Sequence, residues 1–331
     1  MNNLKIKIKE VVFKYLKKKL LLNNIKKISQ LKNNFNLLIH EIYDSLNYMD
    51  IALALEQKKI NLDLSLNENK FPQSLNDFYK IARSEEQDSI HVHTVKKINL
   101  KKILNSLKIK KKDNILVHSS FMNLAKYNIN EKNFFYELKN IVGNKGTIFA
   151  PGFNFIKYFS NKFTRSKTPP HNEFGILPKF IFRLKNTIRS GNPFDSLIGI
   201  GKNANICSTN NFCAYDDKSP WTKLSKINTK IILIDVDFFY CSYLHRIEYK
   251  IKVPYRKLKV FKRKYGKFAL YARKVKKLHL HYNKILSEEK LKKRINHFND
   301  NNINFYSVSC IALDKYISKA INKNKNYFIK K

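Results

Sequence analysis

The sequence predicts an α/β layered domain over residues 97–331, preceded by a small all-helical domain over residues 1–88. Two observations carry this prediction. From about residue 97 onward, apolar strand-like runs alternate with stretches of helical periodicity, whereas residues 1–88 show helical periodicity alone. The charge balance also changes between the two parts. With 331 residues, the chain is long enough to bury a sizeable core.

The distribution of charge marks the boundary between the two parts. Residues 1–40 contain ten lysines and a single acidic residue, whereas residues 41–90 contain ten acidic and five basic residues. After that the chain is basic again. Residues 84–97 are polar and non-periodic, as is typical of a connecting segment, so we place the domain junction there. His91 and His93 in this segment are predicted to be loop residues rather than metal ligands.

The helical domain is predicted to contain three helices, over residues 6–19, 44–58 and 74–82. The second has a good N-cap in Asp44 or Ser45 and carries Leu46, Met49 and Leu53 on one apolar stripe. Free backbone N–H groups and the helix dipole at such an N-terminus favour a phosphate ester on a serine.

This helical domain resembles the acyl carrier proteins. DSLNYMDIALALEQKKINLDL (44–64) matches their Asp-Ser-Leu motif and acidic second helix, and FPQSLNDFYKIA (71–82) resembles their last helix. The resemblance implies 4'-phosphopantetheine on Ser45 and a phosphopantetheinyl transferase as a partner. Ile42 departs from the pattern because a glycine often occupies that position, and the first helix is unusually basic. A small helical appendage with a capping serine is the alternative.

The large domain is predicted to contain buried strands followed by helices. Residues 114–120 form a strand that ends in small hydroxyls, and residues 147–153 form a second strand with a Pro-Gly exit; a helix over residues 135–142 lies between them. Residues 231–236 form another strand, and residues 243–251 have helical spacing. Strands that end in Ser, Gly or Pro allow backbone N–H groups to approach a ligand, although turn chemistry alone also explains these residues.

His245 and Glu248 lie three residues apart on the last of these helices, so they share one face. This is the arrangement of a general base with an orienting carboxylate, although the spacing alone also fits an ordinary polar pair. The helix follows a strand, and ligand sites of α/β sheets lie beyond the C-terminal ends of strands. Since no further His, Asp or Glu clusters there at ligand spacing, no metal is expected.

Over residues 97–325 the chain resembles the aminoglycoside 3-N-acetyltransferase family, the antibiotic N-acetyltransferases. The matching motifs occur in order: LVHSS (116–120), GNKGTIFAPGF (143–153), FGILPKFIFR (174–183), RSGNPFDSLIGIG (189–201), SPWTKL (219–224) and SYLHRIEYKIKVPYR (242–256). Residues 307–321 resemble the family's closing strand and helix. The resemblance implies a central mixed sheet flanked by helices, and acetyl transfer from acetyl coenzyme A to an amine on a sugar ring.

The resemblance, together with the chemistry of the residues, suggests roles in acyl transfer. His245 would take a proton from the attacking amine, and Glu248 would hold the ring tautomer and stabilise the imidazolium. Backbone N–H groups of residues 118–120 would hold the oxyanion, and Ser119, Ser120 and His118 would bind the pantetheine arm. As bases, His118 and also His171 are weaker candidates, for which a structural role is expected.

Asn192, Asp195 and Trp221 are the candidate substrate-binding residues. The family segment Arg-Ser-x-His-Pro-x-His-Ser is RSGNPFDS here, so Asn192 and Asp195 stand where histidines are usual. Two further departures are Ser242, in place of a threonine, and Asp235, in place of a glycine common after the strand. These departures leave the base in place but alter the acceptor site. We therefore expect an amino sugar or an aminoglycoside-like molecule as the acceptor, in a site no longer shaped for an aminoglycoside antibiotic.

Composition narrows the function further. The net charge of +40 comes mainly from lysine, and Asn and Ile are also abundant, as an AT-rich coding sequence would produce; the charge still attracts phosphorylated or acidic ligands such as coenzyme A. The four cysteines lack metal-ligand spacing, and no apolar run approaches the roughly 20 residues of a membrane span. We therefore expect a reduced, cytoplasmic protein that binds no nucleic acid and has no membrane span.

Three hypotheses follow. In the first, an amino-sugar N-acyltransferase is fused to its own carrier domain, and His245 serves a thioester on coenzyme A or on Ser45. In the second, coenzyme A is the only donor and the N-terminal residues are inert. In the third, the chain is a non-catalytic basic binding protein, although its aromatic residues form no basic stacking platform.

Overall fold

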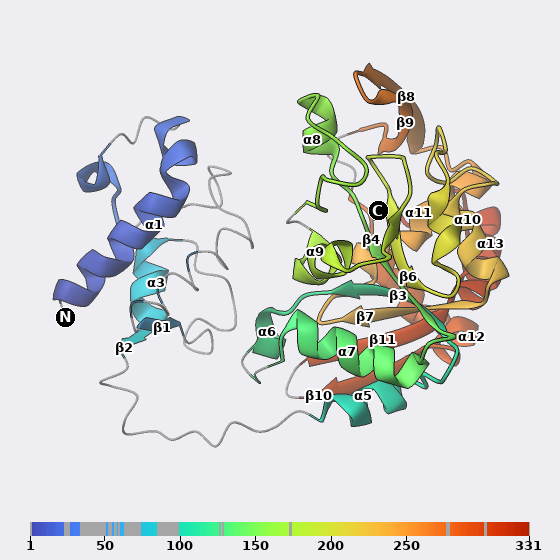
Figure 1. Ribbon diagram of the computed structural model, residues 1–331, viewed down its shortest axis with the longest axis horizontal. Helices are drawn as coiled ribbons and strands as arrows, with labels where there is room; N and C mark the ends of the chain where they lie inside the picture. Colours follow the sequence, from blue (N-terminus) through green and yellow to red (C-terminus); the bar gives the residue numbers. More distant parts are fainter. Residues whose placement is uncertain are drawn as a thin grey trace. The chain divides into compact units, whose positions relative to one another are not determined.

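The computed structural model describes residues 2–22, 27–33, 51, 55, 58, 60–62, 74–84, 99–125, 127, 129–171, 174–275, 279–300 and 303–330. The chain divides into two compact units, Met1–Val95 and Lys96–Lys331 (Figure 1). Ser45, His91 and His93 lie outside the described residues, so the predicted attachment site for phosphopantetheine does too.

The described part of the first unit combines helices with a short antiparallel ladder. Its elements are α1 (Asn2–Leu22), a 3₁₀ turn (Ile28–Gln30), β1 (Ile60–Leu62), α3 (Leu75–Ile81) and β2 (Ala82–Ser84). The Ser74 hydroxyl caps α3 by accepting the Asp77 N–H at 3.3 Å, and Asp77 accepts the Ser74 N–H at 3.0 Å. The β1–β2 pair was not indicated by the helical periodicity, because such short strands carry little pattern of their own.

The second unit is built on a seven-stranded sheet with helices on both faces. Its helices are α5 (Leu100–Ser106), α6 (Met122–Ala125), α7 (Glu131–Val142), α8 (Phe155–Phe159), α9 (Ile176–Arg183), α10 (Pro220–Lys226), α11 (Tyr243–Ile251), α12 (Glu289–Lys292) and α13 (Cys310–Lys323). The sheet contains β3 (Asn114–Ser119), β4 (Thr147–Pro151), β5 (Ile188–Arg189), β6 (Leu197–Gly201), β7 (Thr229–Ile234), β10 (Asn296–Asp300) and β11 (Ile303–Ser309).

The strand order across the sheet is β10-β11-β7-β3-β4-β6-β5. The central strand β3 pairs in parallel with β7 and β4, whereas the outer pairs are antiparallel. The predicted mixed sheet flanked by helices is confirmed.

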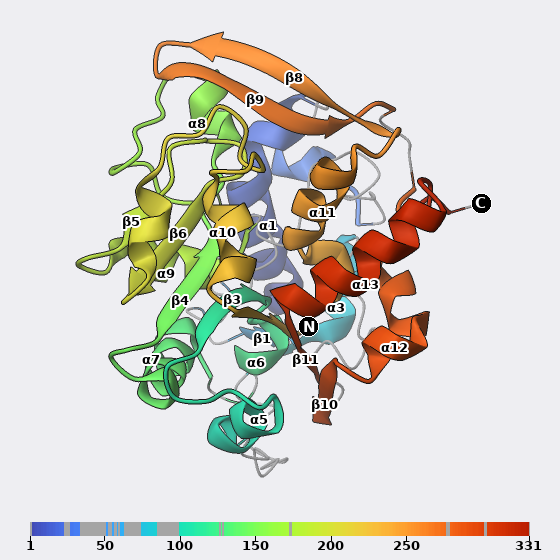
Figure 2. The same ribbon diagram turned by 90° about the vertical axis from the view of Figure 1, so that its right-hand side faces the viewer.

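The residues of β7 show how the sheet forms two cores. Ile231 and Leu233 face the core that contains residues of α10, α11 and α13, while Ile232 and Ile234 face the core of α5, α7 and α9. Figure 2 shows these two groups of helices on opposite sides of the strands. Because both faces of the strand are buried, its sequence is a continuous apolar run rather than an alternating one.

The strand ends at Ile234, two residues earlier than predicted. Asp235 adopts a left-handed conformation, with φ of 52°, that breaks the extended backbone. Asp tolerates this region better than most residues, which explains how it can replace the glycine of related sequences. Its carboxylate also accepts a hydrogen bond from Asn123 Nδ2 at 3.0 Å.

A long hairpin, β8 (Arg256–Arg263) and β9 (Gly266–Arg273), stands apart from the main sheet as a two-stranded ribbon. It runs along one end of the second unit, next to α8 and α11 (Figure 2). Phe159 of α8 packs edge-on against Phe261 of β8 with ring centroids 5.0 Å apart. In the described parts of the chain, no helix is both long and apolar enough to cross a membrane.

Candidate active site

The site forms where the three parallel strands end. β3 ends at His118 and Ser119, and β7 leads through Asp235 and a 3₁₀ turn (Phe238–Tyr240) into α11. The carboxyl ends of parallel strands lie at the same edge of a sheet, where α/β proteins bind their ligands. The chain therefore brings the end of β3 and the first turn of α11 to the same edge.

His245 lies in the first turn of α11, with its side chain 24% exposed. Its Nδ1 is 3.1 Å from Oε2 of Glu248, one turn further along the helix. Leu244 and Ile247 of the same helix are fully buried and anchor it against the sheet. The structure thus brings His245 and Glu248 together, and His245 remains partly accessible.

Glu248 is fully buried and is held by three other side chains. Its Oε2 forms an ion pair with Arg256 Nε at 2.7 Å. Its Oε1 accepts hydrogen bonds from the hydroxyls of Tyr255, at 2.9 Å, and Tyr282, at 2.8 Å. A buried carboxylate requires such compensation, because an unpaired charge in the interior is strongly destabilising.

The contact with Glu248 favours a proton on Nδ1 of His245. Arg256 Nη2 lies 3.1 Å from Nδ1, but it also donates to the Tyr282 hydroxyl at 2.8 Å. The Glu248 carboxylate can only accept, so its 3.1 Å contact with Nδ1 is a hydrogen bond when Nδ1 carries the proton. Nε2 then keeps its lone pair, as a general base requires.

Charge and burial set the protonation of the pair. Burial lowers the pKa of His245 below its ordinary value, and the Arg256 guanidinium lowers it further, while Glu248 acts in the opposite direction. Burial alone would raise the pKa of Glu248, but the hydrogen bond from His245 and the charge of Arg256 hold that pKa below its ordinary value. At neutral pH the pair is therefore a neutral imidazole beside a carboxylate.

The end of β3 carries buried polar groups beside the pair. Burial, followed by the charge of His245, lowers the pKa of His118 to about 3, so His118 is neutral at physiological pH. His118 Nε2 and Ser119 Oγ are buried and have no hydrogen-bond partner among the described residues. The N–H of Ser120, in contrast, donates to the Ile234 carbonyl at 2.9 Å, which withdraws it from the expected oxyanion site.

The three expected substrate-binding residues, Asn192, Asp195 and Trp221, are all buried. Asn192 is 1% exposed, and its amide bonds to backbone groups: Nδ2 donates to the Phe212 carbonyl at 3.0 Å, and Oδ1 accepts from the Phe194 N–H at 3.0 Å. Trp221 is fully buried, and its indole N–H donates to the backbone carbonyl of Asp195 at 2.7 Å. These contacts occupy the polar groups of Asn192 and Trp221 within the protein.

Asp195 is connected to the His245–Glu248 pair through its neighbours. Burial raises the pKa of its carboxyl to about 6, although Tyr215 and the charge of Arg256 act in the opposite direction. Tyr215 in turn meets His245 edge-on, with ring centroids 6.3 Å apart. Asp195 is therefore linked to the pair through Tyr215 and Arg256. His171, the weaker candidate base, lies against Phe155, with ring centroids 6.2 Å apart.

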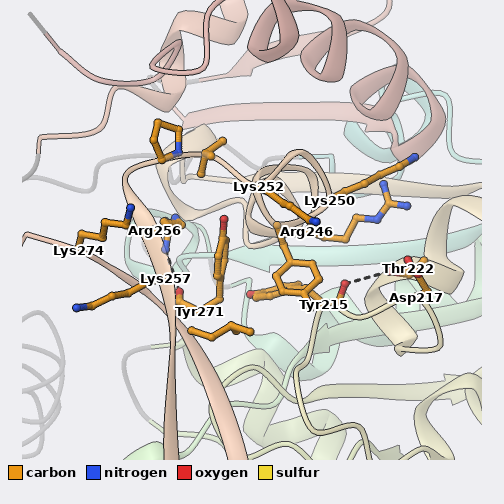
Figure 3. Close-up of a pocket in the computed structure, with 14 residues that line it drawn as sticks. Tyr215, Asp217, Thr222, Arg246, Lys250, Lys252, Arg256, Lys257, Tyr271 and Lys274 are labelled. Carbon is orange, nitrogen blue, oxygen red and sulfur yellow. Dashed lines mark hydrogen bonds between the residues drawn. The ribbon is translucent and has the colours of Figure 1, made fainter.

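A pocket of about 570 Å³ adjoins this network (Figure 3). It lies between the C-terminal part of α11, the base of the β8–β9 hairpin and the segment around Tyr215. Among the residues that line it are Tyr215, Asp217, Arg246, Lys250, Lys252, Arg256, Lys257, Tyr271 and Lys274. Arg256 and Tyr215 belong both to the pocket wall and to the surroundings of His245.

The residues that hold Glu248 were not predicted from the sequence. Tyr255 and Arg256 follow α11 closely, and an Arg beside an HxxE pair is a usable signal because a buried carboxylate needs a cation. Tyr282 lies 37 residues beyond His245 and carries no local signal. Only the packing of the 3₁₀ turn Tyr282–Ser287 against α11 brings its hydroxyl to the pair.

The chain was compared with models of known protein families. The family model of aminoglycoside 3-N-acetyltransferase matches residues 116–313. The chain belongs to the aminoglycoside 3-N-acetyltransferase family, and it is an N-acetyltransferase of EC class 2.3.1.

Several solved structures share the fold of this chain. The chain is similar to the apoenzyme of aminoglycoside acetyltransferase AAC(3)-IVa, with 18% identity, 70% of this chain and 90% of that chain covered, and a TM-score of 0.60. AAC-IIIb in its binary complex with CoASH matches with 18% identity, 68% and 95% coverage, and a TM-score of 0.57. The YokD protein from Bacillus subtilis matches with 18% identity, 68% and 98% coverage, and a TM-score of 0.55. No curated protein sequence matches the chain.

Proposed function

We propose that the chain transfers an acetyl group from acetyl coenzyme A to an amine of an amino sugar, with His245 as the general base. The observation that carries this proposal is the His245–Glu248 contact at 3.1 Å, which leaves Nε2 of a neutral, partly exposed imidazole able to accept a proton. Two similar structures were solved with related ligands: AAC-IIIb is in complex with CoASH, and a mutant of AAC(3)-IVa is in complex with apramycin.

In the reaction, His245 Nε2 accepts the amine proton as the nitrogen attacks the thioester carbonyl. A C–N bond forms and the C–S bond breaks, and His245 returns the proton to the departing thiolate, giving an amide and a free thiol. Glu248 stabilises the transient imidazolium through the Nδ1–H hydrogen bond. Arg256, Tyr255 and Tyr282 keep the Glu248 carboxylate in place.

The end of β3 offers polar groups that can bind the pantetheine arm of acetyl coenzyme A. Buried groups without partners among the described residues, His118 Nε2 and Ser119 Oγ, are able to bond to the amide groups of a pantetheine arm. A neutral His118 also avoids placing a second positive charge beside the imidazolium that forms on His245. We assign the donor side of the site to this end of β3.

The test is thiol release from acetyl coenzyme A with a panel of amino sugars, using the full chain and its His245→Ala variant. We expect loss of roughly 100-fold to 10,000-fold in kcat, the usual contribution of a positioned base. His297→Ala is the matched control, because that histidine is exposed on β10 at the sheet edge, and it should retain full activity. Unchanged acetyl transfer by His245→Ala would overturn the proposed role of His245.

We also propose that the first unit carries the acyl group on Ser45. The Asp-Ser-Leu motif at Ser45, and the capped helix α3 at the position of a last carrier helix, support it. An acyl group on such an arm would reach His245 at an effective concentration of order millimolar for a short flexible linker. Coexpression with a phosphopantetheinyl transferase followed by intact-mass measurement tests this; no mass increase, or an increase retained in Ser45→Ala, would exclude it.

A further inference from the structure

We propose that the pocket beside the His245–Glu248 pair binds a phosphate or pyrophosphate group of the acceptor. The amine that is acetylated then belongs to an anionic amino sugar. The inference rests on the proposed N-acetyl transfer and specifies its substrate class. A volume of about 570 Å³ is in the usual range for a small-molecule site.

The charge in the pocket wall is strongly positive even after internal pairing. Arg246 is paired with Asp314 at 2.6 Å, and Arg256 is paired with Glu248 at 2.7 Å. The remaining charged residues of the wall are Asp217, Lys250, Lys252, Lys257 and Lys274. Four lysines and one aspartate leave a net charge of +3.

The four lysines are available to a ligand. All four are exposed at the rim of the pocket, and nothing in the described part of the chain forms an ion pair with them. They come from three different segments, which are α11 with the residue that follows it, the start of β8, and the residue that follows β9. In Figure 3, Lys257 and Lys274 lie on one side of Tyr271, and Lys250 and Lys252 lie on the other.

The wall beneath this rim is buried, and its side chains are hydrogen-bonded within the protein. Arg246, Arg256 and Tyr271 line the pocket and are each less than one-tenth exposed. Arg256 Nη1 donates to the Tyr271 carbonyl at 3.2 Å, and the Tyr271 hydroxyl donates to the Glu248 carbonyl at 3.1 Å. A ring would therefore rest on fixed aromatic and guanidinium surfaces, with its anionic group among the lysines.

The position of the pocket favours the acceptor as the source of the phosphate. Arg256 and Tyr215 belong both to the pocket wall and to the immediate surroundings of His245. In a sugar phosphate, the anionic group is bonded to the ring that carries the amine. In coenzyme A, by contrast, the whole pantetheine arm separates the phosphates from the thioester.

The same charges disfavour a polycationic acceptor. Aminoglycosides carry several ammonium groups at neutral pH, and like charges brought together at a partly buried site repel each other. Among the described residues that line the pocket, Asp217 is the only acidic one, and it cannot balance four lysines. The pocket is therefore matched to an anionic ligand.

Binding of inorganic pyrophosphate to the full chain, measured by calorimetry, tests the site directly. We expect Lys250→Gln/Lys257→Gln to weaken binding about tenfold, since two charge-assisted contacts are lost. The matched control is Lys226→Gln/Lys259→Gln, which changes an exposed lysine in the last turn of α10 and another on β8, both outside the pocket. Absence of binding, or equal weakening in both double variants, would overturn the inference.

The source of the phosphate is tested by saturation with coenzyme A. A site for the acceptor keeps its pyrophosphate when coenzyme A is bound, whereas displacement would assign the pocket to the donor and overturn the inference. In acetyl transfer, glucosamine 1-phosphate should have a higher kcat/KM than glucosamine, and the difference should shrink in Lys250→Gln/Lys257→Gln.

Equal kcat/KM values for the two sugars would overturn the anionic-acceptor inference but leave the proposed N-acetyl transfer intact. Failure to acetylate any amino sugar, by protein that still binds pyrophosphate in a lysine-dependent way, would instead count against the proposed function.

Discussion

At the scale of single residues, the protonation of His245 is set by burial and by two neighbours of opposite charge. Burial disfavours the imidazolium most, Arg256 disfavours it further, and Glu248 favours it. The result is a base that stays neutral at physiological pH but gains stabilisation from Glu248 as it accepts a proton.

This balance predicts the pH profile of kcat/KM. The rate should fall as pH drops through the pKa of His245, at a midpoint below the ordinary histidine value of 6.5, because only the neutral ring accepts a proton. Glu248→Gln removes the anion that raises this pKa, so the acid limb should move to still lower pH. The kcat should also fall, by about 100-fold or more, because the imidazolium loses its partner.

Steady-state rates between acidic and neutral pH measure both effects. A shift of the acid limb toward higher pH in Glu248→Gln, or an unchanged kcat, would contradict the assigned role of Glu248. Thermal unfolding of the variant at each pH separates loss of rate from loss of structure.

At the scale of elements, the mixed sheet depends on close approach of two strands at Gly201. This residue ends β6 with φ of 123°, and a Cβ there would overlap the backbone carbonyl oxygen of Gly146. Gly143, at the end of α7, also has a positive φ, of 68°, but a Cβ there would meet only side-chain atoms of Lys111, the nearest at 3.8 Å.

These two glycines form a matched pair for a stability measurement. Each substitution by alanine imposes backbone strain of about 1–3 kcal/mol, and Gly201→Ala adds a clash with backbone that Gly143→Ala lacks. We therefore expect Gly201→Ala to lower the free energy of unfolding, measured with urea, by more than Gly143→Ala. Equal losses would show that the approach of β6 to β4 is not constrained at this position.

At the scale of the whole molecule, the second unit contains the sheet, both cores and the complete His245 network. A chain of residues 96–331 should therefore unfold cooperatively on heating and should keep its kcat/KM with acetyl coenzyme A as donor. Calorimetry and thiol release measure the two properties. A carrier role predicts that the first unit matters only when the acyl group is attached to Ser45.

The truncation also separates the two enzyme hypotheses. Full activity with acetyl coenzyme A, combined with an unmodified Ser45 in the full chain, would support coenzyme A as the only donor. Loss of acetyl transfer in a folded 96–331 chain would contradict the assignment of the complete site to the second unit.

Local pattern in the sequence was sufficient for much of the fold. The helix Tyr243–Ile251 matches its predicted range, and strands β3, β4 and β7 lie where apolar runs predicted them. The contact between His245 and Glu248 could also be predicted, because residues three apart on a helix share a face wherever that helix lies. The early end of β7 could not be predicted, because it depends on the left-handed backbone conformation of Asp235. Hydrophobic periodicity carries no information about that conformation.

The sequence by itself thus determined the family, the layered α/β architecture and the histidine–carboxylate pair, because each follows from ordered motifs or from spacing within one element. Only the tertiary structure decided that Tyr282 and Arg256 hold Glu248, and that Trp221 and the amide of Asn192 are engaged within the protein. It also placed four lysines from separate segments around one pocket. These contacts could not be predicted because burial and hydrogen-bond partners depend on how segments distant in the sequence pack together. A local sequence pattern does not show which distant segments will be in contact.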